Sequence, residues 1–287
     1  GSWKFCVQKH RILKDGKSSL LQNINRKTSI MKRIISILFS VSCLMVVSAA
    51  GRDADTLKIM TYNLRFGELA SMEDIGEYIS SEAPDIVALQ ECDWATCRER
   101  AHHQNGVKFI NELSYRTGMF GIYGKSIDYR GGYYGIGILS RYPIISSERI
   151  LLPNPEDKEQ RVMLVADIEL PDGKVLTFVC THLEVSSSGS RVEQVKFIRK
   201  RLADKKICLL AGDMNSAPDS PEMAYLCKYW KNLTDEGLTY SSMEPSVKID
   251  YIYGRPSDAV GLISTGVQAD VRLSDHFPVI SKISIVR

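Results

Sequence analysis

The clearest structural signal in the chain is the stretch Ile207-Cys208-Leu209-Leu210-Ala211-Gly212-Asp213-Met214-Asn215. Five apolar residues are followed at once by Gly212, Asp213 and, two residues later, Asn215. A short apolar run that ends in turn-forming residues is typical of a buried strand. The sequence therefore predicts a strand at 207–211 with polar side chains directly after its end, where α/β proteins usually place functional groups.

Three further apolar runs end in the same way. Residues 57–62 lead into Asn63, residues 85–89 into Gln90-Glu91, and residues 175–181 into His182. A single polar residue after a strand is more often a turn former than a catalytic group. Four such endings indicate more, because neighbouring strands that deliver them to one sheet edge would form a cluster of oxygen ligands and hydrogen-bond donors.

From residue 57 onward, short β-rich runs alternate with helical patterns. Further strands are predicted at 135–139, 162–170, 249–253 and 279–285. The turn at 171–174 (Pro-Asp-Gly-Lys) predicts an antiparallel hairpin, because its glycine accepts the positive φ that a tight turn requires.

Two helices are predicted between these strands. Ser71 followed by Asp74 resembles a capping box at the start of a helix, and Pro84 ends that helix. A second helix, at about 191–202, repeats apolar residues at helical spacing. Hairpins and helical crossovers together favour mixed sheets that are covered by helices.

The first 50 residues are set apart from the fold. Met31-Lys32-Arg33, the apolar run at 34–47 and Ser48-Ala49-Ala50-Gly51 have the layout of a secretory signal peptide. The apolar run is shorter than the roughly 20 residues of a bilayer span. An uncleaved anchor and lipoprotein processing at Cys43 are the less favoured alternatives. We predict a non-native or disordered leader at 1–30, a signal peptide at 31–50 and one folded domain at 51–287.

The charge of the chain is divided between these parts. Residues 1–50 hold nine of the 37 Lys and Arg but one of the 34 Asp and Glu, which leaves 28 basic and 33 acidic residues, a formal charge of −5. A protein that grips long stretches of phosphate backbone usually carries a basic excess. The predicted domain has none, although folding could assemble a basic groove from scattered residues.

The cysteines give little evidence for a structural metal. Cys180 and Cys208 lie in apolar runs, where cysteine behaves as a small hydrophobic residue. Cys92 and Cys97 are the one pair considered for a disulfide in an oxidising compartment. No second Cys or His pair accompanies them at zinc-site spacing.

Two more polar motifs lie near the end of the chain. Asp250 belongs to a β-rich run at 248–252, and Ser274-Asp275-His276 precedes the last predicted strand. Because adjacent side chains point in different directions, Asp275 and His276 are expected to serve different partners.

Together these motifs resemble, in order, those of the endonuclease/exonuclease/phosphatase superfamily. They are Thr61-Tyr62-Asn63, Leu89-Gln90-Glu91, Ile138-Leu139-Ser140-Arg141-Tyr142-Pro143, Thr181-His182-Leu183, Gly212-Asp213-Met214-Asn215, Ile249-Asp250 and Ser274-Asp275-His276. The resemblance covers residues 57–287. It implies a DNase I-like α/β fold, a four-layer sandwich of two packed mixed β-sheets flanked by helices. It also implies hydrolysis of phosphate esters in nucleic acids, phospholipid head groups, phosphoinositides or nucleotides.

The resemblance implies a magnesium site, with Mn²⁺ as the alternative ion. Glu91 is the first predicted ligand, with Asn63 and Asp275 beside it. A hard cation prefers oxygen ligands and keeps several waters, so one or two carboxylates suffice.

Five residues are predicted to act in the reaction. His276 with Asp250 resembles the family's His-Asp pair, in which the carboxylate orients the imidazole. Asp213 is the candidate for positioning or deprotonating water, and whether Asp213 or His276 is the general base stays open. His182 and Asn215 would donate hydrogen bonds to the transition state.

Three residues are candidate substrate contacts. Arg161 precedes a predicted strand where many relatives have an arginine, and its alternative role is a surface ion pair. Asp93 and Arg98 follow Glu91 in a pattern similar to that of secreted bacterial relatives. The nearby glycine-rich stretch at 130–135 is interpreted as a tight turn with half-buried tyrosines rather than as a base-stacking platform. It also lacks the asparagine that relatives carry before the motif at 138–143.

The sequence thus predicts an exported, Mg²⁺-dependent phosphodiesterase or phosphatase. The expected substrate is a small or lipid-attached phosphate ester, the expected location is periplasmic or extracellular, and no obligate protein partner is evident. A secreted DNase I-like nuclease is the alternative. A non-catalytic binding module on the same fold would lack some polar strand-end groups, and all of them are present here.

Overall fold

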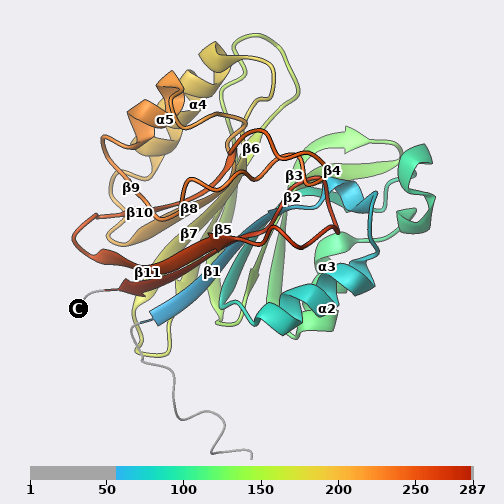
Figure 1. The fold of residues 1–287 in the computed structure, drawn as a ribbon, viewed down its shortest axis with the longest axis horizontal. Coiled ribbons are helices and arrows are strands. Elements are labelled where there is room, and N and C mark those ends of the chain that lie inside the picture. The colour runs from blue at the N-terminus through green and yellow to red at the C-terminus, as the bar shows by residue number, and fades with distance from the viewer. Residues whose placement is uncertain (1–55, 286–287) are drawn as a thin grey trace, which may run out of the picture. The chain divides into compact units, whose positions relative to one another are not determined.

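The computed structural model describes residues 56–285, and the predicted leader at 1–30 and signal peptide at 31–50 lie outside these residues. Two six-stranded sheets pack face to face, and helices cover the outer face of each (Figure 1). The predicted four-layer α/β sandwich is confirmed.

The first sheet is built around a parallel pair of strands. Its spatial order is β11 (Val260–Val267), β12 (Val279–Ile285), β1 (Thr56–Asn63), β2 (Ile86–Trp94), β4 (Gly132–Ser140) and β3 (Phe120–Tyr129). β1 and β2 are parallel and are connected through α2 (Met72–Glu82), whereas the other neighbouring strands are antiparallel. The helix α3 (Phe109–Thr117) packs beside α2 on the same face.

The second sheet repeats this plan. Its order is β5 (Ile144–Leu151), β6 (Val162–Glu169), β7 (Val175–His182), β8 (Cys208–Asp213), β10 (Asp250–Arg255) and β9 (Lys231–Asn232). β7 and β8 are parallel and are connected through α4 (Ser188–Arg201), and the other neighbours are antiparallel. The short helix α5 (Pro221–Leu226) packs beside α4.

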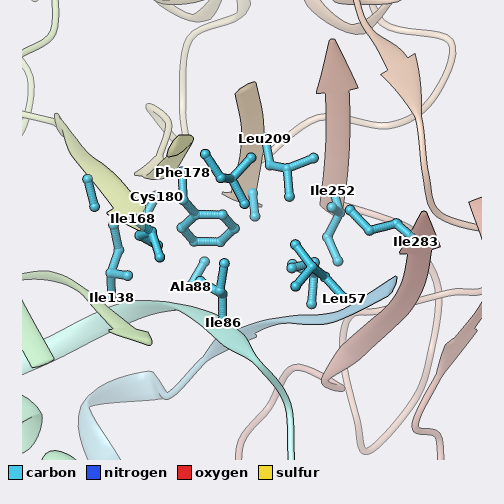
Figure 2. Packing of buried hydrophobic residues seen from close by; sticks show 14 of the residues in the cluster. Leu57, Ile86, Ala88, Ile138, Ile168, Phe178, Cys180, Leu209, Ile252 and Ile283 are labelled. Carbon is cyan, nitrogen blue, oxygen red and sulfur yellow. The ribbon is translucent and has the colours of Figure 1, made fainter. Parts of the chain in front are cut away.

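Three apolar clusters separate the four layers. The central one lies between the sheets, where Phe178 from β7 faces Ile86 and Ala88 from β2 (Figure 2). A second cluster joins the first sheet to α2 and α3, and a third joins the second sheet to α4 and α5. Both sheets are buried on two faces in their middle strands, which explains why those strands have nearly continuous apolar sequences.

The predicted helix starts and turns follow local chemistry. The Ser71 hydroxyl accepts a hydrogen bond from the Asp74 amide, and the Asp74 carboxylate accepts one from the Ser71 amide, so the capping box is confirmed. α4 begins three residues before the predicted start at 191, because Ser187 caps its first turn. Gly173 has φ of +81° in the predicted hairpin, and the strands that it joins, β6 and β7, are antiparallel.

The sequence did not predict β3, β5, β9 and β11, nor the helices α3 and α5. These four strands are the outer strands of the two sheets. Within residues 56–285 none of the helices has both the length and the apolar character that crossing a membrane requires.

The candidate disulfide was wrong. Cys92 and Cys97 are both free thiols, because Cys92 is buried within β2 whereas Cys97 is exposed beyond the end of that strand. The pair therefore does not fix the segment that follows Glu91.

Candidate active site

The polar strand ends meet at one end of the sandwich. Strand pairing sets Asn63 beside Gln90, His182 beside Asp213, and Asp213 beside Asp250. Asn63 Nδ2 also donates a hydrogen bond across the two sheets to Asp213 Oδ2, at 3.0 Å. Three of the four predicted strand ends, Asn63, His182 and Asp213, thus meet. The strand predicted to end at Leu89 instead continues to Trp94, and Glu91 joins the cluster from within β2.

Asp213 is held in place by a glycine and a turn. Gly212 has φ of +152°, and a Cβ atom on it would lie 2.0 Å from the carbonyl oxygen of Thr181 on the neighbouring strand. β7 and β8 can therefore approach closely only if residue 212 is glycine. Beyond it, Asp213 Oδ1 accepts a hydrogen bond of 2.8 Å from the amide of Asn215, which fixes the carboxylate.

Glu91 owes its orientation to a β-bulge. The pairing of β2 with β4 shifts register between Leu89 and Cys92, and Glu91 has a left-handed φ of +53°. A bulge re-aims a side chain that regular pairing would direct elsewhere. Glu91 Oε1 accepts a hydrogen bond from Asn63 Nδ2 at 3.1 Å. Burial and the negative charge of Asp275 raise the pKa of Glu91, although Asn63 and His276 partly offset them.

Asp213, Asp250 and His276 form a buried charged triad. His276 Nδ1 lies 2.9 Å from Asp250 Oδ2, and His276 Nε2 lies 3.7 Å from Asp213 Oδ2. Burial alone would lower the pKa of His276, but Asp250 and Asp213 raise it to about 10. Burial and Asp250 also raise the pKa of Asp213 to about 7. His276 is therefore an imidazolium at neutral pH, and Asp213 is a carboxylate of unusually high basicity.

His182 also contacts Asp213, but as a neutral imidazole. Its Nε2 is 3.4 Å from Asp213 Oδ2, and its Nδ1 is 3.3 Å from Arg161 Nη1. Because a guanidinium can only donate, Nδ1 must accept and the ring proton resides on Nε2. Burial, the charge of Arg161 and that of His276 lower the pKa of His182 well below its ordinary value. His182 is thus a neutral imidazole that presents an N–H group.

Asp275 is bound by Arg65, a residue that the sequence analysis missed. Arg65 Nη1 donates to the Asp275 carboxylate, and Arg65 Nε donates to Glu68 Oε2 at 2.5 Å. The Arg65 amide donates to Asn63 Oδ1 at 2.9 Å, within a turn where Arg65 and Phe66 have φ of +44° and +43°. The sequence feature that could have indicated Arg65 as a site residue is its position two residues after Asn63.

The remaining predicted residues surround this centre. Asn215 has a left-handed φ of +48° and donates through Nδ2 to the carbonyl of Leu183 at 3.0 Å, directly after His182. Arg98 donates to both oxygens of the buried Asp93, at 2.6 and 2.9 Å. No hydrogen bond joins Asp93 or Arg98 to Asp213 or Glu91 in the described part of the chain, so the two form a separate pair beside the centre.

Three aromatic rings lie beside the Arg98 guanidinium. The Arg98 guanidinium lies 4.1 Å from the Phe66 ring, 4.2 Å from the Tyr129 ring and 5.2 Å from the Tyr134 ring. Burial raises the pKa of Tyr134, and the charge of Glu91 adds to the shift. The predicted turn is confined to Arg130 and Gly131, because β4 begins at Gly132; Tyr134 is half-buried as predicted, whereas Tyr133 is exposed.

Two sets of residues could hold a metal ion. Ligand atoms of Asp213, Asp250 and His276 lie within 4.8 Å of one another. In that set the protonated His276 offsets one of the two carboxylate charges. Glu91 and Asp275 repel each other, and Arg65 offsets the charge of Asp275 alone, so a divalent cation held by the two carboxylates beside Asn63 would relieve the repulsion at Glu91.

Comparisons with known proteins identify the family and the fold. Residues 60–276 match the model of the Endonuclease/Exonuclease/phosphatase family. The Escherichia coli protein YbhP is 23% identical over 248 residues, which cover 80% of this chain and 97% of YbhP. An endonuclease/exonuclease/phosphatase structure from Beutenbergia cavernae has a TM-score of 0.67 at 19% identity, over 81% of this chain and 72% of that one. The mannosyl-6-phosphatase of Bacteroides thetaiotaomicron has a TM-score of 0.63 at 20% identity, over 80% of this chain and 100% of that one.

Proposed function

Because the chain belongs to the endonuclease/exonuclease/phosphatase family, whose members are phosphoesterases, we propose that it hydrolyses a small or lipid-attached phosphate ester in a metal-dependent reaction outside the cytoplasm. One observation carries the proposal. Asp213 contacts one neutral and one protonated imidazole. His182 Nε2 lies 3.4 Å and His276 Nε2 lies 3.7 Å from the same carboxylate oxygen.

Asp213 has the properties of a general base at neutral pH. Its pKa of about 7 leaves a large fraction ionised while making the carboxylate basic enough to take a proton from water. Asn63 and the Asn215 amide hold the two carboxylate oxygens in fixed directions. In this proposal Asp213 deprotonates the attacking water, which assigns the role that the sequence left open.

The two histidines then act as hydrogen-bond donors of different strength. His276, held as an imidazolium by Asp250, donates to a phosphoryl oxygen and offsets part of its charge. His182 donates a hydrogen bond from its neutral Nε2–H group to the transition state, and the Arg161 guanidinium lies behind the ring. Preorganised donors in a buried site stabilise a developing charge more than the same donors would in water.

A magnesium or manganese ion would be held by Glu91 and Asp275, with the Asn63 amide beside them. Bound there, it would polarise a phosphoryl oxygen and offset negative charge in the transition state. Asn63 would then connect this side of the site to Asp213, because its amide already contacts both Glu91 and Asp213.

The proposed substrate class rests on charge and on one structural relative. The predicted domain carries a formal charge of −5, which does not favour a long polyanion. The Bacteroides thetaiotaomicron relative, which shares the fold, is a mannosyl-6-phosphatase. A nuclease is the second candidate, because the family also includes endonucleases and exonucleases. Export through the signal at 31–50 is part of the proposal.

A substrate panel tests the proposal. Purified protein is assayed on p-nitrophenyl phosphate, bis(p-nitrophenyl) phosphate, a sugar phosphate, sphingomyelin, a phosphoinositide and plasmid DNA, with Mg²⁺ or Mn²⁺ and with chelator. We expect chelator-sensitive hydrolysis of a small or lipid ester and little cleavage of DNA. Efficient DNA cleavage would favour the nuclease function instead. Activity unaffected by chelator would exclude the metal-dependent reaction. No turnover of any substrate would contradict the proposal.

A further inference from the structure

Glu184 is a buried carboxylate with one oxygen lacking a hydrogen bond. It lies two residues after His182, and its side chain is 3% exposed. Its Oε1 accepts hydrogen bonds from the amide and the hydroxyl of Ser186, at 2.9 and 2.7 Å. Its Oε2 has no hydrogen-bond partner among the described residues and lies 3.9 Å from Nε of Arg161.

Arg161 also has a buried polar atom without a hydrogen bond. Its side chain is 6% exposed, and its Nε also lacks a hydrogen-bond partner within the described chain. Its Nη1 reaches Glu159 Oε1 at 2.9 Å and His182 Nδ1 at 3.3 Å. A buried guanidinium requires a counter-charge, because desolvation of an unpaired ion is costly.

The two acidic neighbours of Arg161 differ in what they can supply. The Glu159 side chain is 39% exposed, so solvent screens its interaction. Glu184 is buried beside Arg161, where the lower effective dielectric strengthens the attraction. Burial opposes ionisation of Glu184, but the Ser186 hydrogen bonds lower its pKa, so it is a carboxylate at neutral pH. Glu184 is therefore the buried counter-ion of Arg161.

The crossover helix α4 fixes the position of Glu184. The Glu184 amide donates to Gln194 Oε1, and the Glu184 carbonyl accepts from Arg191 Nη1, both at 3.0 Å. A continuous series of contacts thus runs from α4 through Glu184 and Arg161 to His182 and Asp213.

We propose that Glu184 is a positioning residue: by neutralising Arg161 in the interior, it holds Arg161 Nη1 against His182 Nδ1 and thereby keeps the His182 Nε2–H group directed at Asp213. Its effect on turnover rests on the proposed phosphoesterase function. Its effect on the histidine does not, because the contacts exist without substrate.

Glu184→Gln is the informative variant. Glutamine keeps the volume and can still accept from Ser186 through its oxygen, but its NH₂ group would then face Arg161 Nε, donor against donor. Arg161 is expected to turn toward Glu159 and to leave His182 Nδ1. Glu184→Asp keeps the charge and is the rescue variant, and Glu159→Gln is the matched control that removes only the exposed partner.

The first measurement is the His182 tautomer, read from ring ¹⁵N chemical shifts of histidine-labelled full-length protein without substrate, with His182→Gln to assign the signal. We expect an Nε2–H tautomer in the wild type and in Glu159→Gln, a mixture of tautomers in Glu184→Gln, and recovery of the Nε2–H form in Glu184→Asp. An unchanged tautomer in a folded Glu184→Gln protein would overturn the proposal, as would an equal change in Glu159→Gln.

The second measurement is kcat and KM on the best substrate of the panel. We expect kcat of Glu184→Gln to fall about 10- to 100-fold, as is common for groups that orient a functional side chain. KM should change less, and the loss in Glu184→Asp should be smaller. If the wild type hydrolyses nothing, the proposed function fails, while the tautomer measurement still decides whether Glu184 positions His182.

Discussion

The two crossover units of the sandwich, β1–α2–β2 and β7–α4–β8, share one plan but end in different chemistry. Each has two parallel strands joined through a helix. The first carries Asn63 at the end of β1 and Glu91 at the bulge within β2, an amide and a carboxylate that suit a cation. The second ends in His182 and Asp213, an imidazole and a carboxylate that suit proton transfer. The same backbone architecture therefore provides both halves of the site, and the residue types at the strand ends decide which half does what.

The same contrast recurs between the two histidines that contact Asp213. Behind Nδ1, His276 has the Asp250 carboxylate and His182 has the Arg161 guanidinium. The pKa is raised in the first and lowered in the second. The group behind the ring, rather than the histidine itself, decides whether the imidazole is a cation or a neutral donor.

Removing the basic oxygen at the centre should have the largest effect. Asp213→Asn keeps the shape but cannot take a proton from water, so we expect kcat to fall by about 10³-fold, within the usual range for general-base catalysis. The melting temperature should change little, because removing a buried charge is stabilising whereas the introduced NH₂ group replaces an oxygen that accepts from Asn215 or Asn63. Kinetics and thermal melts on Asp213→Asn and on the exposed Asp204→Asn would check this. Turnover close to wild type would remove Asp213 from its role as base.

Removing the support of His276 should have a smaller effect. In Asp250→Asn the imidazolium loses its main partner, so the pKa of His276 should fall toward its ordinary value of 6.5. The pKa of Asp213 should fall as well, because Asp250 helps to raise it. We expect kcat to fall roughly 10- to 100-fold. An NMR titration measures the pKa of His276 in the variant. An unchanged pKa would show that Asp250 does not raise it.

Changing the cation half should alter metal dependence before it alters the chemistry. Glu91→Gln removes one predicted ligand charge, and we expect the Mg²⁺ or Mn²⁺ concentration for half-maximal activity to rise about 10- to 100-fold. Titration calorimetry measures the affinity for the metal directly, without substrate. Glu99→Gln, at the exposed start of the 3-10 helix Glu99–Gln104, is the control. Equal metal affinity in Glu91→Gln and wild type would exclude Glu91 as a ligand.

The smallest expected effect is on the pH dependence of stability, measured with chelator present. The pKa of Asp213 is about 7 in the folded chain against an ordinary 3.8, so the folded state binds the extra proton between these values. Stability from this group is present at low pH and is lost as pH rises through about 7. His276 acts in the same direction between its ordinary 6.5 and about 10. Denaturant unfolding should show a flatter slope for Asp213→Asn between pH 4 and 7, and the same slope as wild type would contradict the raised pKa.

Much of the central architecture could be predicted from local sequence. The middle strands are buried on both faces and therefore have unbroken apolar runs, and the capping box at Ser71 and the turn at Gly173 depend on neighbouring residues only. The outer strands were missed for the complementary reason. β5, for example, is exposed along most of its length, so its sequence has no apolar run.

The sequence by itself determined which polar groups stand at the ends of the buried strands, because a strand end is encoded in a few adjacent residues. Only the tertiary structure decided what those groups can do. Asn63 and Asp213 are 150 positions apart in the chain yet share a hydrogen bond. The charge states of His182 and His276, the Arg65 contact to Asp275 and the pairing of Glu184 with Arg161 also depend on segments that meet only after folding. Electrostatic interactions act through space and burial changes their strength, so the protonation of this site is a property of the packed sandwich and of no single motif.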